Sequence, residues 1–278
     1  MMKRLTSGHT GQFDLILRVA IAGIIASTCT MGVRGEIVSI SDGDATFEFD
    51  TDITETDDSN ALLTVNDVGM LYSTFAFINL GGDNLIQPVS STSVAGSEAM
   101  LQFDGIGGVI DMTITAAIEQ TGENSVVGLL NYSLVNVTNA PISGSLITYF
   151  DVDLEGDESL DETATFEGDT LSVFDSTSSF EIGGGITSTP NAVQADEYST
   201  LIDALSDNSL TQLDDTGFPR TDDVTVALQY DFEIPANGFT NISQVFSGTA
   251  VAIPEPSLLV PCGLCAVSGL LRRRRDVK

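Results

Sequence analysis

Regular alternation of apolar and polar residues dominates the middle of this chain. Two stretches show it most clearly, Val109 to Ile118 and Val224 to Ile234. A period of two is typical of a β-strand with one buried face. In the first stretch the inward positions are Ile110, Met112, Ile114, Ala116 and Ile118. In the second they are Val224, Val226, Leu228, Tyr230, Phe232 and Ile234.

Further strands are predicted on both sides of these two. They read ATFEFD, ALLTV, MLYSTFAFIN, VVGLLNYSLVNV and ISGSLITYFDVD, and Gly, Asn, Asp and Ser separate them as turns require. Many strands at this spacing, without long intervening helices, favour an all-β fold and an antiparallel β-sandwich.

One short helix is predicted near Tyr198. The apolar residues Tyr198, Leu201, Ile202 and Leu205 recur at helical spacing. Asp196 and Glu197 would suit the first turn, where negative charge is favourable. We expect the helix to lie in a long inserted loop from Thr187 to Asp223.

Charge divides the chain into a strongly acidic body and two basic ends. Between Glu36 and Ile253 there are 37 acidic residues and a single basic residue, Arg220. This division indicates that the ends serve a different purpose from the body. It predicts three parts: a signal peptide (1–35), an exported acidic β-domain (36–252) and a C-terminal signal (253–278).

The first end has the order of a secretory signal peptide. Basic residues including Lys3 and Arg4 precede an eleven-residue apolar stretch, Val19 to Cys29. Small residues then favour cleavage before Glu36. The alternative is a lipoprotein signal at Cys29, which Thr28 disfavours.

The last end combines three features in a fixed order. Pro254, Glu255 and Pro256 precede fifteen uncharged residues, Ser257 to Leu271. The four arginines Arg272, Arg273, Arg274 and Arg275 follow. The apolar stretch would form a short transmembrane helix, and the arginines would stay on the cytoplasmic side.

This tail resembles the PEP-CTERM sorting signal of bacteria, which has the same three features in the same order. The resemblance covers about the last 25 residues, and Pro261 inside the apolar stretch departs from the usual pattern. It implies recognition by an exosortase, processing near the motif, and delivery to the cell surface or an extracellular matrix. The C-terminal helix would hold the chain in the membrane only until processing. Extracellular polysaccharide is a further expected partner.

The body lacks the side chains on which much enzyme chemistry depends. It contains no His, Lys, Cys or Trp between residues 36 and 253. This excludes Ser–His and Cys–His nucleophiles, Schiff-base lysines and histidine-bound zinc. The acidity also excludes nucleic acid as a partner. Carboxylate pairs remain, but their abundance singles out none, and we expect that the chain is not an enzyme.

Calcium is the one cofactor that the sequence indicates. DVDLEGDESLDE, from Asp151 to Glu162, has the oxygen-ligand spacing of a calcium loop. The predicted ligands are Asp151, Asp153, Glu155, Asp157 and Glu162. A solvated acidic turn is the alternative interpretation.

Three functions are consistent with these patterns. The first is a non-catalytic surface or matrix protein sorted by an exosortase. The second is a calcium-dependent carbohydrate-binding or adhesive module. The third is a carboxylate-dependent polysaccharide hydrolase or lyase.

Overall fold

The computed structural model describes eight stretches of the chain. They are residues 37–51, 61–82, 84–85, 89–154, 162–176, 178–184, 188–207 and 211–250. The predicted signal peptide and the predicted sorting signal, including Pro254–Pro256 and Arg272–Arg275, lie outside them and stay predictions. Within the described residues, no helix is long and apolar enough to cross a membrane.

One layer of the fold is a nine-stranded sheet, in which every pair of neighbours is antiparallel. Its strands, in spatial order, are β16 (Arg220–Asp222), β12 (Glu162–Glu167), β13 (Thr170–Phe174), β14 (Ser178–Gly184), β18 (Phe239–Ala250), β10 (Ser125–Asn136), β9 (Ile110–Gly122), β8 (Glu98–Ile106) and β7 (Ser91–Ala95).

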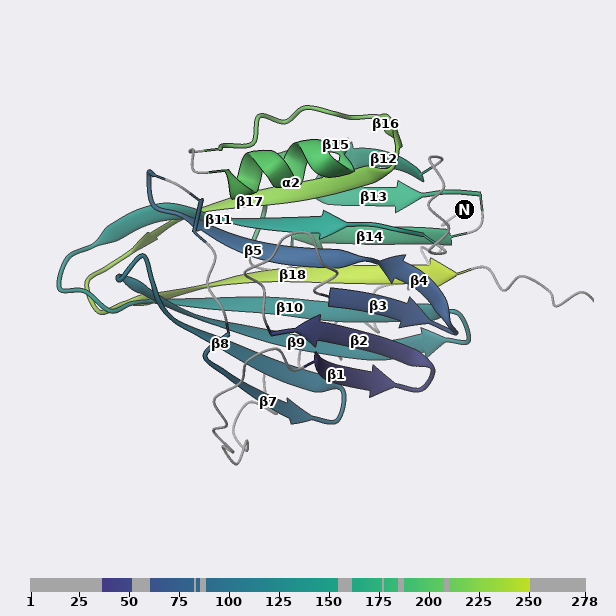
Figure 1. Ribbon diagram of the computed structural model, residues 1–278, viewed down its shortest axis with the longest axis horizontal. Helices are drawn as coiled ribbons and strands as arrows, with labels where there is room; N and C mark the ends of the chain where they lie inside the picture. The colour runs from purple at the N-terminus through teal and green to yellow at the C-terminus, as the bar shows by residue number, and fades with distance from the viewer. Residues whose placement is uncertain are drawn as a thin grey trace, which may run out of the picture.

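Two smaller antiparallel sheets form the second layer and cover one face of the first (Figure 1). The four-stranded sheet has the order β1 (Ile37–Asp42), β2 (Ala45–Asp50), β3 (Ala61–Val65) and β4 (Val68–Leu71). The five-stranded sheet has the order β15 (Ala192–Glu197), β17 (Val224–Ile234), β11 (Ile142–Asp151), β5 (Ser73–Asn79) and β6 (Asn84–Leu85).

The predicted antiparallel β-sandwich is therefore confirmed for the described residues. Apolar side chains from all three sheets form one continuous core. The predicted inward residues of β9 lie in this core or pack against it, and those of β17 are all buried. Phe246 of β18 lies edge-on to Phe47 of β2 and so links the two layers, and it stacks against Phe180 of β14 within the nine-stranded sheet.

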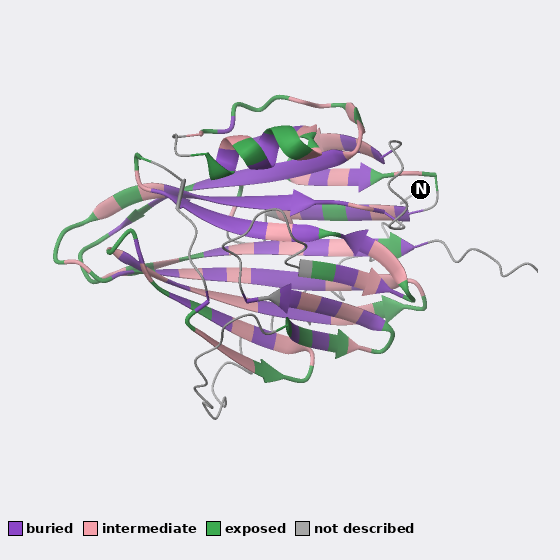
Figure 2. Ribbon diagram, viewed as in Figure 1, coloured by how far each residue is buried: buried purple, intermediate pink, exposed green. Residues whose placement is uncertain are grey.

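Strand β17 is buried on both faces in its first half, which differs from the prediction of one buried face (Figure 2). Thr225, Ala227 and Gln229, on the face expected to meet solvent, are at most 6% exposed. The cause is the helix α2 (Tyr198–Ser206), which packs its buried Leu201, Ile202 and Leu205 on the outside of β15 and β17.

The region predicted as a long loop from Thr187 to Asp223 contains regular structure. Besides α2 it contributes β15 and β16, which extend two different sheets. Asp196 and Glu197 belong to β15, where they pair with Thr225 and Val224 of β17, and not to the first turn of the helix. Strand pairing outweighed the favourable end charges, so the helix begins only at Tyr198.

Candidate functional site

Two chain crossovers between the layers meet at one corner of the sandwich. The chain leaves the five-stranded sheet at Asp151 and enters the nine-stranded sheet at Glu162. It leaves the nine-stranded sheet at Asp222 and returns to the five-stranded sheet at Val224. The corner lies near the labels β12, β15 and β16 in Figure 1.

Acidic residues stand at both crossovers. We call Asp151, Asp153, Glu162 and Asp223 the corner carboxyl cluster. Asp151 and Glu162 are buried, with 3% and 2% of their surfaces exposed. Asp153 and Asp223 are half-buried, so the cluster reaches the protein surface at these two residues.

Asp151 has the most perturbed carboxyl group of the cluster. Burial raises its pKa from the ordinary value of 3.8 to about 8. The negative charges of Asp223, Asp153 and Glu162 add to this rise, while a hydrogen bond from Ser73 opposes it. A large share of Asp151 therefore holds its proton at neutral pH.

Glu162 is perturbed in the same direction but less strongly. Burial is the largest cause of a rise in its pKa to about 7, and the charges of Asp153 and Asp223 contribute. Hydrogen bonds from its own backbone N–H and that of Leu154 favour the ionised form. Its Oε2 atom is buried and has no hydrogen-bond partner among the described residues. Glu162 thus offers an unused acceptor inside the cluster.

The surroundings of the cluster raise the pKa values of two further groups. Burial, followed by the charges of Asp222 and Glu197, raises the pKa of Asp223. Burial also raises the pKa of Tyr149 above its ordinary range, and the Asp151 charge adds to it. The Tyr149 hydroxyl is buried and has no hydrogen-bond partner among the described residues. The nearby Thr225 hydroxyl donates to the backbone carbonyl of Asp196, 3.2 Å away.

Arg220 is the only basic residue of the acidic body, and it lies beside this corner on β16. Its guanidinium nitrogens lie 3.2 Å from Asp196 and 3.5 Å from Asp222, with Glu197 at 4.0 Å. The Nε atom is buried and has no hydrogen-bond partner in the described part of the chain. Arg220 joins the end of β15 to β16 and neutralises acids next to the cluster.

The described residues include three of the five predicted calcium ligands. Asp151, Asp153 and Glu162 lie in one cluster, whereas Glu155 and Asp157 fall outside the described residues. In the part of the chain that the structure describes, no three His, Cys, Asp or Glu side chains are close enough to hold a metal ion. Calcium binding stays a prediction.

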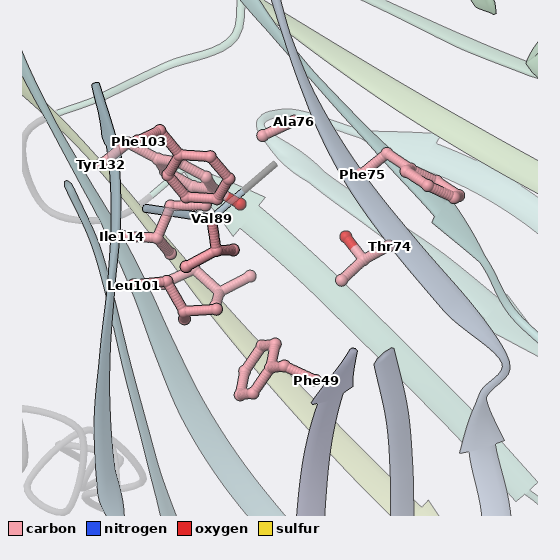
Figure 3. A pocket seen from close by; sticks show the side chains of 10 residues that line it. Phe49, Thr74, Phe75, Ala76, Val89, Leu101, Phe103, Ile114 and Tyr132 are labelled. Atoms are coloured by element: carbon pink, nitrogen blue, oxygen red, sulfur yellow. The ribbon is translucent and has the colours of Figure 1, made fainter. Parts of the chain in front are cut away.

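A separate pocket lies between the layers, where the four-stranded and five-stranded sheets adjoin above β8, β9 and β10 (Figure 3). Aromatic residues from four strands line it, including Phe49, Phe75, Phe103 and Tyr132. Its volume is about 40 Å³, and most of its lining side chains are apolar. The lining offers few polar groups to bind the hydroxyls of a sugar ring.

Sequence reasoning found part of the corner carboxyl cluster and missed the rest. The calcium-loop spacing identified Asp151, Asp153 and Glu162 but gave no role to Asp223. No spacing along the chain links Asp223 to these residues, because Asp223 reaches the corner through a second crossover.

No family model and no curated protein matches this chain. Among solved structures, a bacterial glucoamylase complexed with acarbose matches 86% of this chain at 10% identity, with a TM-score of 0.52. The chain spans 37% of the length of that protein. A galactose mutarotase related enzyme from Lactobacillus acidophilus is covered over 99% of its length at 6% identity, with a TM-score of 0.48. A heparan sulfate lyase from Pedobacter heparinus has a TM-score of 0.45 at 8% identity, with 86% of this chain and 41% of the lyase covered.

All three are carbohydrate-active enzymes by name, and the glucoamylase, with a TM-score above 0.5, contains a β-sandwich of the same fold as this chain. The prediction that the chain is not an enzyme is contradicted by this finding. It was wrong because the acidic residues are so abundant that the sequence singled out no carboxylate pair. The fold instead buries two carboxyl groups, Asp151 and Glu162, which composition alone cannot reveal.

Proposed function

We propose that the described domain is a carbohydrate-active enzyme domain that uses the corner carboxyl cluster to cleave a polysaccharide. One observation carries the proposal: two neighbouring buried carboxyl groups have pKa values raised to about 8 and about 7. Near neutral pH one of them can hold a proton while the other is ionised. A general acid and a general base need this difference in protonation.

The roles follow from the order of the two pKa values. Asp151, with the higher pKa, is the acid that protonates the leaving oxygen. Glu162, with the lower pKa, is the base, and its unpartnered Oε2 atom is free to accept a proton. No His, Lys or Cys competes for these roles, because the body contains none.

The surroundings support cleavage at this corner. Asp153 and Asp223 reach the surface beside the two buried groups, which gives a substrate a polar approach. Their charges help to keep Asp151 protonated, because a second negative charge close by disfavours ionisation. Removing either half-buried acid would therefore lower the pKa of Asp151 and weaken it as an acid at neutral pH.

The test is release of reducing or unsaturated ends from a panel of polysaccharides by the purified full-length protein. We expect Asp151→Asn and Glu162→Gln each to lower turnover at least a hundredfold, which is within the usual loss for an acid or base. Glu181→Gln is the matched control, since it removes one charge from the exposed face of β14. Normal turnover in both cluster variants would disprove the assignment.

We further propose that the domain acts outside the cytoplasmic membrane. The signal peptide pattern (1–35) and the tail from Pro254 to Arg275 support export, exosortase processing and delivery to the surface or matrix. Polysaccharide of that matrix would then be within reach of the corner carboxyl cluster.

A further inference from the structure

The charges around the corner carboxyl cluster limit which sugars it can accept. Besides the four clustered acids, Asp196 and Asp222 lie at the same corner through their contacts with Arg220. Arg220 is the only Lys or Arg between residues 36 and 253, and these acids already engage it. The body therefore has no second basic side chain with which to bind the carboxylate of a uronic acid or a sulfate group.

An acidic sugar would meet repulsion from the two members of the cluster that reach the surface. These are the half-buried Asp153 and Asp223. Two like charges about 4 Å apart in water-like surroundings weaken binding by about fivefold, and by more where water is excluded. The net negative charge of the body adds a long-range repulsion that salt screens over about 8 Å.

Glu162 supplies the second, independent observation. Its Oε2 atom is buried, accepts no hydrogen bond from the residues that the structure describes, and belongs to a carboxyl group whose neighbours Asp153 and Asp223 are also acceptors when ionised. A buried acceptor of this kind favours a ligand that brings a donor. Sugar hydroxyl and ammonium groups are donors, whereas carboxylates and sulfates are not.

We infer that the site takes a polysaccharide of neutral or amino sugars and cleaves it by hydrolysis, not by elimination. This inference rests on the proposed function above. Elimination removes the proton beside a uronate carboxylate and needs that carboxylate to be neutralised. The only basic side chain at this corner, Arg220, is already engaged by Asp196, Glu197 and Asp222. In hydrolysis, water attacks the anomeric carbon and gives a proton to Glu162. The bond from that carbon to the bridging oxygen breaks, and this oxygen takes the proton of Asp151.

The test compares oligosaccharides of equal length made from amino, neutral or uronic hexoses, each in both anomeric linkages. We expect kcat/KM at low ionic strength to be at least tenfold higher for an amino or neutral set than for the uronic set. Asp223→Asn should narrow this difference, because it removes a charge where the cluster reaches the surface. Glu181→Gln makes the same change in net charge on the exposed face of β14 and should leave the difference unchanged.

The outcomes separate the inference from the proposed function. Cleavage of the uronic set at an equal or higher rate, or products with an unsaturated end, would overturn the inference and leave the proposed function standing. No cleavage of any set would overturn the proposed function. Calorimetric binding of the same sugars then decides the charge preference, and tightest binding of the uronic set would refute it.

Discussion

Replacing Asp151 with Asn should make the protein more stable at pH 8 and remove part of its pH dependence. The pKa of this carboxyl group rises from 3.8 to about 8 on folding, so the native state holds more protons than the unfolded chain between those values. Burial of the protonated Asp151 therefore costs the native state nothing extra below pH 3.8. As the pH rises from there, the unfolded chain is increasingly favoured by ionisation, and the contribution of Asp151 to stability is lost once the pH passes about 8.

The size of the effect follows from the shift. A rise of about four pKa units corresponds to an upper limit of about 6 kcal/mol. Asn keeps the shape of the side chain but never ionises, so it avoids this cost. The variant still loses the ionised partner of the Ser73 hydrogen bond, so we expect a net gain of about 2–4 kcal/mol at pH 8. At pH 4 the variant and the wild type should be nearly equal.

Urea unfolding followed by far-ultraviolet circular dichroism at pH 4, 6 and 8 measures this directly, and suits a protein without tryptophan. General repulsion among the acids also lowers stability as the pH rises, but it acts on every variant. Glu181→Gln reports that background because its side chain is exposed. The unfolding free energy of Asp151→Asn should depend less on pH than that of Glu181→Gln. The same pH dependence in both variants, or a lower stability of Asp151→Asn at pH 8, would refute the effect of burial on Asp151.

Three further predictions test the fold, the corner and the ends of the chain. Leu205→Ala should cost about 2–4 kcal/mol in urea unfolding, because this fully buried side chain joins α2 to the five-stranded sheet; a loss below about 0.5 kcal/mol would contradict that packing. Arg220→Ala should lower the unfolding free energy by about 1–2 kcal/mol at low salt, and Arg220→Lys should recover part of it; equal stability of all three proteins would show that the ion pairs are immaterial. Mass spectrometry of surface protein should find an N-terminus near Glu36 and no peptide containing Arg272–Arg275; intact ends would refute export and exosortase processing.

The strands were predictable because their burial is decided locally. Val224, Val226 and Leu228 alternate with polar or small residues, and the sandwich buries them as expected. The burial of Thr225 and Gln229 was not predictable in this way. It depends on α2 and on the segment after it, where the backbone N–H of Leu213 donates to the Gln229 side chain at 3.1 Å.

The predicted start of the helix was wrong for the opposite reason. A signal in the local sequence was outweighed by tertiary contacts. Asp196 and Glu197 have the charge that the first turn of a helix favours. In the folded protein their backbone pairs with β17, and the Asp196 side chain contacts Arg220. A partner about 25 residues away decides this, and no pattern within the helix itself reports it.

Two buried members of the corner carboxyl cluster could be predicted from the sequence, but the contribution of Asp223 could not. Asp151 and Glu162 stood out because their spacing within one loop resembles a set of calcium ligands. The contribution of Asp223 arises only when a second crossover, between β16 and β17, reaches the same corner. Burial then converts a set of acids into groups with different pKa values, which spacing along the chain cannot reveal.

The pH dependence of kcat/KM for polysaccharide cleavage tests the central claim most directly. With Glu162 as base and Asp151 as acid, activity should rise as the pH passes about 7, fall as it passes about 8, and be highest between them. These limits belong to the coupled pair of carboxyl groups. Glu162→Gln should remove the acidic limb together with most of the rate. A rate that is highest near pH 4–5, or a profile unchanged in Glu162→Gln, would contradict the account.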